Sequence, residues 1–136
     1  MIALVDTPIW SYALRSRNPQ FQAHADELIR MIADSEALII GPIRQEVLSG
    51  YSDLKSFEFL ENKLSFFDNT PIVNSDYVQA ARYSNKCRRK GIQGSPTDFL
   101  ICAVATRNDV PIFTTDKDFD HYKKRLPIRL YEMTSG

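Results

Sequence analysis

The stretch Ile2-Ala3-Leu4-Val5-Asp6-Thr7-Pro8-Ile9-Trp10 decides the fold class. Four consecutive apolar residues predict a short strand buried on both faces, and Asp6 marks the point where that strand leaves the core. Thr7-Pro8 predicts the start of a helix, because proline suits the first helical positions after a polar cap. We therefore expect the Asp6 carboxylate at the carboxyl end of a central strand, where open α/β sheets bind ligands.

The same order of strand, turn and helix recurs along the chain. Short apolar runs predict further strands at residues 37–40, 71–73, 110–113 and 128–131. Apolar side chains at helical spacing, together with turn and cap residues, predict helices over 21–32, from 42 to about 50, over 57–67, from 74 to about 90, and from 96 past 105. This alternation predicts an α/β fold in one domain, residues 1–136: a three-layer sandwich with a central parallel sheet of four to five strands flanked by helices.

Composition excludes some classes of protein. The formal net charge is zero, so no overall field attracts the chain to nucleic acid or membrane, and an anionic partner has to meet a local patch. The apolar helical run 99–105 is far too short to cross a bilayer, and Asp6 interrupts the first apolar segment, so we expect a soluble cytoplasmic protein. Cys87 and Cys102 have no metal-ligand spacing and are expected to be free thiols in a reducing compartment.

Four carboxylates lie at the ends of predicted strands or the starts of predicted helices. Asp6 and Asp116 follow strands, whereas Glu46 and Asp98 lie near the beginning of helices. Each has a purely structural explanation. Asp6 suits a helix cap and Glu46 an ordinary solvated helix position. Asp116 suits the cap of the turn before Asp118, and Asp98 suits the third position of a capping box.

Taken together, these acids indicate a shared site. The carboxyl ends of parallel strands meet at one edge of the sheet, so the four side chains are expected to converge. Two like charges about 4 Å apart repel by roughly 4 kcal/mol at a surface-like dielectric, and a divalent cation removes that penalty. Oxygen ligands without a His or Cys cluster favour Mg²⁺ or Mn²⁺ over zinc. His24 and His121 have no partner at ligand spacing and are expected to pack or lie on the surface.

Four stretches resemble the motif blocks of the PIN domain: Leu4-Val5-Asp6-Thr7, Arg44-Gln45-Glu46-Val47-Leu48 before Gly50, Thr97-Asp98-Phe99-Leu100-Ile101-Cys102-Ala103-Val104-Ala105, and Thr114-Thr115-Asp116-Lys117-Asp118-Phe119. The likeness spans nearly the whole chain and is closest to the small VapC-type toxins of bacterial toxin-antitoxin pairs. It implies a metal-dependent endoribonuclease that uses Mg²⁺, with Mn²⁺ as a substitute. The implied acidic site is Asp6, Glu46, Asp98 and Asp116, with Asp118 and the Thr114 hydroxyl in support.

The resemblance also implies a reaction and partners. Water attack on a phosphodiester of RNA would leave a 5′ phosphate and a 3′ hydroxyl. A cognate antitoxin would cover the acidic pocket, often by inserting a basic side chain, and a homodimer is expected. One residue departs from the family pattern, because Pro8 stands where a serine or threonine is common. A hydroxyl at this position could hold a water near the metal, so its absence is expected to affect the rate of cleavage or the preference for one metal rather than the activity itself.

Two surfaces are candidates for these partners. The basic run Lys86, Arg88, Arg89 and Lys90 precedes the loop leading to Asp98. These cations suit contacts with RNA phosphates, and they equally suit a solvated helix end that complements the helix dipole. The predicted helix 57–67 carries Phe59 off its apolar stripe, which favours contact with an antitoxin or a second copy. Trp10 is expected to pack in the core rather than stack on bases.

Two other functions fit the same residues. One is a catalytically idle PIN-like module that only binds RNA or protein, which the presence of all four acids disfavours. The other is a phosphatase or an RNA-processing nuclease outside a toxin-antitoxin pair, which the short chain disfavours. Stabilisation by manganese separates a working site from an idle one, because an ion that binds only the folded state stabilises it.

Overall fold

Three short parallel strands form the centre of the computed structural model, which describes residues 1–15 and 18–133. The sheet order is β2 (Ala37–Leu38), β1 (Ala3–Val5) and β3 (Ile112–Phe113). Leu4 pairs with Leu38 on one side and with Ile112 on the other. Because β1 is central, the residue that follows it, Asp6, lies at the middle of the carboxyl edge.

Two isolated parallel bridges extend this sheet at both sides. Ile39, directly after β2, bridges to Asn69, and Ile112 of β3 bridges to Leu130. Five chain segments therefore run in parallel, in agreement with the predicted sheet of four to five strands. The predicted strand at 128–131 is reduced to the bridge at Leu130.

The predicted strand at 71–73 is wrong. These residues form no strand, because their polar backbone groups bind side chains instead of a neighbouring strand. The Val73 N–H donates to Asp76 Oδ2 over 3.0 Å, and the Pro71 carbonyl accepts from Arg107 over 2.9 Å. Asp76 is 2% exposed and forms a two-point ion pair with Arg107, which ties the start of one helix to the end of another.

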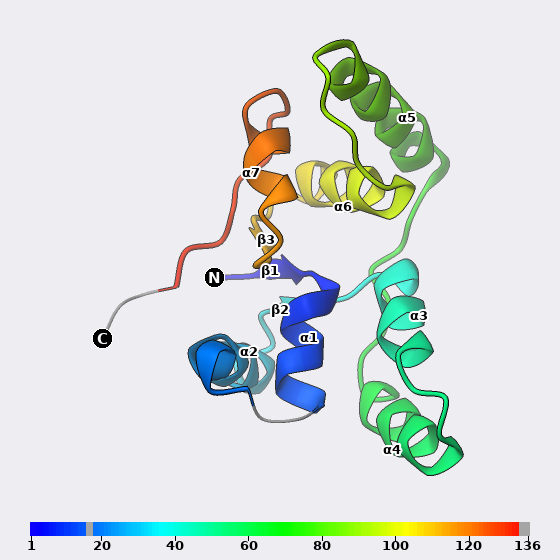
Figure 1. Ribbon diagram of the computed structural model, residues 1–136, viewed down its shortest axis with the longest axis vertical. Coiled ribbons are helices and arrows are strands. Elements are labelled where there is room, and N and C mark those ends of the chain that lie inside the picture. Colours follow the sequence, from blue (N-terminus) through cyan, green and yellow to red (C-terminus); the bar gives the residue numbers. More distant parts are fainter. Residues whose placement is uncertain (16–17, 134–136) are drawn as a thin grey trace.

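Helices cover both faces of the sheet (Figure 1). They are α1 (Thr7–Leu14), η1 (Pro19–Phe21), α2 (Gln22–Ala33), α3 (Gly41–Ser49), α4 (Leu54–Leu64), α5 (Asn74–Arg89), α6 (Pro96–Arg107) and α7 (Asp118–Lys123). Figure 1 shows the strands between α6 and α7 above and α1 and α2 below, with α3 and α4 to the right. The predicted three-layer α/β arrangement is confirmed. Among residues 1–15 and 18–133, every helix falls short of the length and apolar character that a membrane span requires.

Helix α6 lies at the centre of the hydrophobic core. Its residues 99–105 are all buried, because its apolar side chains surround the helix and contact β1, β3 and α5. Trp10 is fully buried, stacks edge-on against Phe67, and donates its indole N–H to the Val5 carbonyl over 3.0 Å. Its predicted packing role is confirmed. Cys87 and Cys102 are buried free thiols, as predicted.

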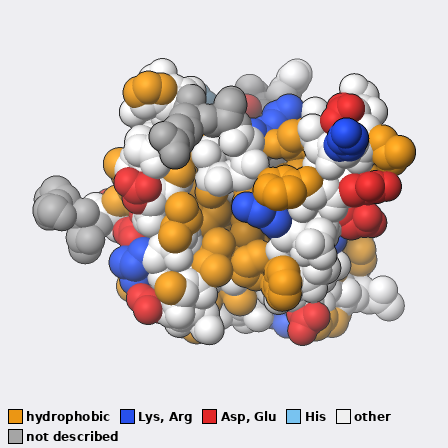
Figure 2. Space-filling model, turned by 90° about the horizontal axis from the view of Figure 1, so that it is seen from below, with side chains coloured by type: hydrophobic (Ala, Val, Ile, Leu, Met, Phe, Trp, Pro, Cys, Tyr) orange, Lys and Arg blue, Asp and Glu red, His pale blue; other side chains and the backbone are white. Residues whose placement is uncertain are grey.

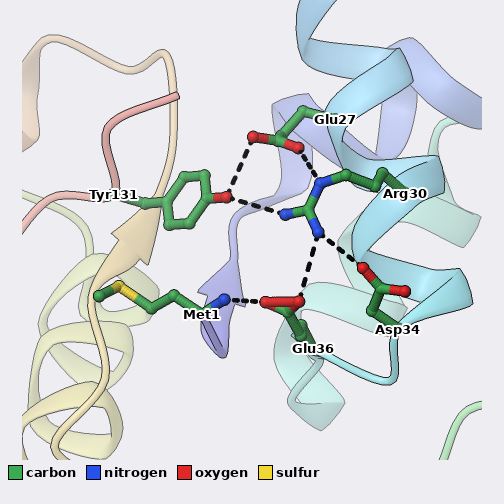
Figure 3. A network of polar contacts seen from close by, with 6 residues as sticks. All are labelled: Met1, Glu27, Arg30, Asp34, Glu36 and Tyr131. Atoms are coloured by element: carbon green, nitrogen blue, oxygen red, sulfur yellow. Dashed lines mark hydrogen bonds and ion pairs between the residues drawn. The ribbon is translucent and has the colours of Figure 1, made fainter. Parts of the chain in front are cut away.

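A polar network around Arg30 joins α2 to the segment that follows α7 (Figure 3). The Arg30 guanidinium bonds carboxylates of α2 and of the turn after it, and Tyr131 donates to one of the same acids. The residues drawn together are Met1, Glu27, Arg30, Asp34, Glu36 and Tyr131. Because the Arg30 side chain is 46% exposed, each of these ion pairs contributes little to stability, and together they mainly fix the relative positions of the segments.

Candidate metal centre

Asp6 is a buried carboxylate at the carboxyl end of β1. Its side chain is held on both oxygens: Oδ1 accepts the Thr7 N–H and Oδ2 accepts the Thr114 hydroxyl, each over 2.8 Å. Burial raises the pKa of Asp6 to about 6, against the lowering effect of these two hydrogen bonds, and the charges of Asp98 and Asp116 raise it further. The predicted helix cap is therefore present, and the same carboxylate faces two other acids.

Three further aspartates converge beside it. Carboxylate oxygens of Asp98, Asp116 and Asp118 all lie within 4.8 Å of one another. Asp98 is fixed at the start of α6, where its N–H donates to the Ser95 hydroxyl over 3.1 Å. Asp116 receives the Asp118 N–H on Oδ1 over 2.9 Å and donates its own N–H to the Thr114 hydroxyl over 3.0 Å. The predicted turn cap at Asp116 is present, the Thr114 hydroxyl contacts both Asp6 and the Asp116 backbone, and Asp118 lies inside the acidic cluster.

Sequence reasoning missed Tyr122. This residue of α7 is fully buried, and its hydroxyl donates to Asp98 Oδ2 over 2.6 Å. The pKa of Asp98 is raised, chiefly by burial, and the hydrogen bonds from Tyr122 and Ser95 act in the opposite direction. A signal was available, because Phe119 and Tyr122 are three residues apart and both face the core.

Glu46 lies at the margin of this group. It is exposed on α3, and its Oε2 accepts the Thr7 hydroxyl over 2.7 Å. The structure therefore connects Glu46 to Asp6 through the residue that follows Asp6, and does not place it within the three-aspartate cluster. Pro8 lies in the first turn of α1, and the neighbouring Thr7 hydroxyl is already committed to Glu46.

The other sequence candidates lie apart from the acids. His24 packs against Phe21 and Phe113, with ring centroids 5.7 and 6.1 Å away, and His121 is exposed. Both agree with the expected packing and surface roles. The basic run Lys86, Arg88, Arg89 and Lys90 is exposed at the carboxyl end of α5. Within residues 1–15 and 18–133, no carboxylate forms an ion pair with this run.

The donor set fits a hard divalent cation. At 4.8 Å and an effective dielectric of about 20, each pair of charged carboxylates repels by roughly 3 kcal/mol. Aspartate oxygens are ligands that Mg²⁺ and Mn²⁺ prefer, and the cluster contains neither histidine nor cysteine. Asp6 adds a fourth carboxylate whose burial disfavours its charge unless a cation is close.

The sequence matches the PIN domain model over residues 3–125. The chain therefore belongs to the PIN domain family, whose members are generally nucleases, and the resemblance seen in the four motif blocks is confirmed. No protein of curated function matches the chain by sequence.

Several solved structures share this fold at low sequence identity. The chain is similar to FitAcB from Neisseria gonorrhoeae, with a TM-score of 0.74, 20% identity and 97% of each chain covered. It is similar to VapBC2 from Rickettsia felis bound to a promoter DNA fragment, with a TM-score of 0.73, 16% identity, and 98% of this chain and 100% of that chain covered. It is also similar to DNA-bound VapBC from Salmonella typhimurium, with a TM-score of 0.72, 17% identity, and 96% of this chain and 98% of that chain covered. At these identities the likeness establishes the fold.

Removing the charge of Asp6 should flatten the dependence of stability on pH in the metal-free protein. The Asp6 pKa rises from 3.8 to about 6 on folding, so its contribution to stability is full below pH 3.8 and is lost as pH rises through 6. In EDTA, the free energy of unfolding should fall by up to about 3 kcal/mol more in the wild type than in Asp6→Asn between pH 4 and pH 7.5. Urea unfolding at both pH values measures this difference.

Asp120→Asn is the matched control, because Asp120 is an exposed aspartate of α7 outside the cluster. In this variant the free energy of unfolding should depend on pH as it does in the wild type. Equal slopes for the wild type and Asp6→Asn would contradict the electrostatic description of Asp6.

Proposed function

We propose that this chain, as a single PIN domain over residues 1–136, is the metal-dependent endoribonuclease toxin of a type II toxin-antitoxin pair. Family membership and the likeness to VapBC and Fit structures support the proposal. The observation that carries it is the convergence of Asp98, Asp116 and Asp118 beside the buried Asp6, at the carboxyl edge of the sheet.

We assign different roles in hydrolysis to the individual acids. Asp6, Asp98 and Asp116 would hold one or two Mg²⁺ ions, or Mn²⁺ in their place, with Asp118 in support. The chemistry that a divalent ion would supply there is a bound water of lowered pKa and positive charge that offsets the negative charge on the phosphoryl oxygens. Glu46 is exposed at the margin, where it would complete the metal site or orient the attacking water. The products would carry a 5′ phosphate and a 3′ hydroxyl.

Hydroxyl groups keep these acids in position. Thr114 donates to Asp6 and accepts from the Asp116 backbone, so one side chain joins two of the acids. Thr7 also contacts two acids, because its hydroxyl donates to Glu46 and its backbone N–H donates to Asp6. Such contacts fix ligand orientation before the ion arrives, which lowers the reorganisation needed for binding and catalysis.

The substrate strand needs positive charge that the zero net charge of the chain does not supply globally. The basic run at the end of α5, Lys86 to Lys90, is exposed and free of ion pairs among the described residues. It precedes the loop that leads to Asp98. We therefore assign the RNA phosphates to this run.

The antitoxin contact is assigned to a groove beside α4. Its volume is about 540 Å³, and it is lined by Leu14, Arg15, Tyr51, Lys55, Ser56, Phe59 and Leu60. Figure 2 shows hydrophobic side chains gathered in a hollow on the face that contains the ends of α1 and α4. Phe59 is 59% exposed there, and Leu54 at the start of α4 is 69% exposed, which favours burial by a partner.

Two further contacts complete the set of partners. The aspartate cluster suits a basic side chain from the antitoxin, because a cation offsets the repulsion that a metal ion would otherwise relieve. A homodimer is part of the proposal as well. Tyr77 and Val78 on α5 are about half exposed and provide an apolar face apart from α4.

Asp98→Asn should slow RNA cleavage strongly while keeping the fold. The amide preserves shape and accepts the Tyr122 hydroxyl, but removes a metal-binding charge. We expect the rate to fall by about 100-fold or more, equivalent to roughly 3 kcal/mol in the barrier. Cleavage of a labelled RNA by purified protein measures it, with Asp120→Asn as the control and EDTA as a second arm. Full activity in Asp98→Asn, or cleavage in excess chelator, would contradict the proposal. Absence of stabilisation by Mn²⁺ would favour an idle binding module.

The double substitution Arg88→Gln and Arg89→Gln should weaken RNA binding and reduce the dependence of that binding on salt concentration. Two lost phosphate contacts reduce the slope of log K against log salt by roughly 1.4 for a single strand. Fluorescence anisotropy in EDTA measures binding without cleavage. The control is Lys55→Gln with Lys63→Gln on α4, which removes the same charge elsewhere. An unchanged slope for the α5 variant would mean that the basic run does not bind RNA phosphates and only complements the dipole at the end of its helix.

Phe59→Glu should weaken antitoxin binding at least tenfold and leave RNA cleavage by the free chain unchanged, because the groove lies apart from the acids. Phe66→Glu is the matched control, since Phe66 is 83% exposed and does not line the groove. Titration of the purified chain and its variants with the antitoxin that the proposal requires measures the affinity. Equal affinities for both variants would exclude the groove as the contact.

A further inference from the structure

The Tyr122 phenol is the only group that the core presents directly to a carboxylate of the three-aspartate cluster, among the contacts of the described residues. Its ring packs against Phe99 and Phe119, and each ring centroid lies 5.1 Å from that of Tyr122. The side chain is fully buried, so its oxygen position is set by core packing. A buried hydroxyl needs a partner, and this one donates to Asp98 Oδ2 over 2.6 Å.

The loop before α6 closes over this phenol so tightly that residue 94 has to be glycine. A Cβ at Gly94 would contact the Tyr122 hydroxyl oxygen and lie 2.8 Å from its Cζ and 2.9 Å from Phe99 Cζ. Any larger residue would push the phenol away from Asp98. The sequence therefore preserves space for this hydroxyl at one specific place, next to the cluster.

The orientation of Asp98 has an electrostatic cost that the phenol offsets. Asp98 faces Asp116 and Asp118, and a partly exposed carboxylate beside like charges lowers its energy by rotating toward water. A hydrogen bond on Oδ2 opposes that rotation and leaves Oδ1 available for another ligand. A tyrosine hydroxyl is protonated at neutral pH and can donate to a carboxylate, as this one does to Asp98.

We propose that Tyr122 is a positioning residue of the metal centre, whose hydroxyl holds the Asp98 carboxylate in the orientation that binds the divalent cation. This inference rests on the proposed function and adds to it a residue outside the four motif blocks. Tyr122 acts through Asp98 and need not touch the ion or the RNA.

Manganese affinity tests the proposal without a catalytic assay. Electron paramagnetic resonance of free Mn²⁺ gives the Kd of purified wild type and of Tyr122→Phe, which keeps the ring and removes only the hydroxyl. We expect Tyr122→Phe to bind Mn²⁺ about tenfold more weakly, the effect typical of groups that orient metal ligands. Gly94→Ala should weaken binding similarly, and the double variant should be no weaker than the singles, because both changes remove one contact.

Tyr131→Phe is the matched control. Tyr131 also donates its hydroxyl to a carboxylate, Glu27 Oε2, over 3.0 Å, but at the α2 network away from the cluster. Its Kd for Mn²⁺ should stay within twofold of wild type. Unfolding in EDTA, measured on every variant, separates a loss of stability from a loss of affinity.

The outcomes distinguish the two proposals. Wild-type affinity in Tyr122→Phe, with or without a loss of stability in EDTA, would overturn the positioning role and leave the proposed function intact. Failure of wild-type protein to bind Mn²⁺ would overturn the proposed function and the positioning role with it. Gly94→Ala is dispensable if it does not fold, because Tyr122→Phe decides the question alone.

Discussion

Repulsion between converging carboxylates is the constraint on which the rest of this structure depends. The parallel sheet brings Asp6 and Asp116 to one edge, and α6 delivers Asp98 to the same place. At these distances the charges oppose folding by several kcal/mol in total. Hydrogen bonds offset part of this repulsion: the Thr7 N–H and the Thr114 hydroxyl donate to Asp6, and the Tyr122 hydroxyl donates to Asp98. These donors hold the acids together and leave a residual negative charge that suits a divalent cation.

One segment of the chain organises this arrangement. From 114 to 122 it supplies a hydroxyl to Asp6, two carboxylates to the cluster and the phenol that bonds Asp98. It runs from the end of β3 into α7, whose residues Phe119 and Tyr122 are anchored in the core. The position of the acids therefore depends on core packing rather than on exposed loops, which is the requirement for a preorganised site.

The sequence predicted features that have local signals. An apolar run ending in Asp6 before Thr7-Pro8 is such a signal, and so is the apolar helix 99–105; both were found. The run 71–73 has the same apolar character, yet its backbone is committed to Asp76 and Arg107, the latter more than 30 residues away along the chain, so no local pattern excludes a strand there. The contact of Tyr122 with Asp98 spans 24 residues and was missed for the same reason. The contact of Glu46 with Thr7 depends on tertiary packing of α1 against α3, so no local pattern indicates it, and the role of Glu46 in the acidic site stays a prediction.

The central claim is that these aspartates form one binding site for a divalent cation. A crystal of the protein soaked in MnCl₂, with diffraction recorded near the manganese absorption edge, tests it most directly. The account predicts an anomalous peak within coordination distance of carboxylate oxygens of at least two among Asp6, Asp98, Asp116 and Asp118. A peak bound only elsewhere, or none at saturating manganese, would contradict it.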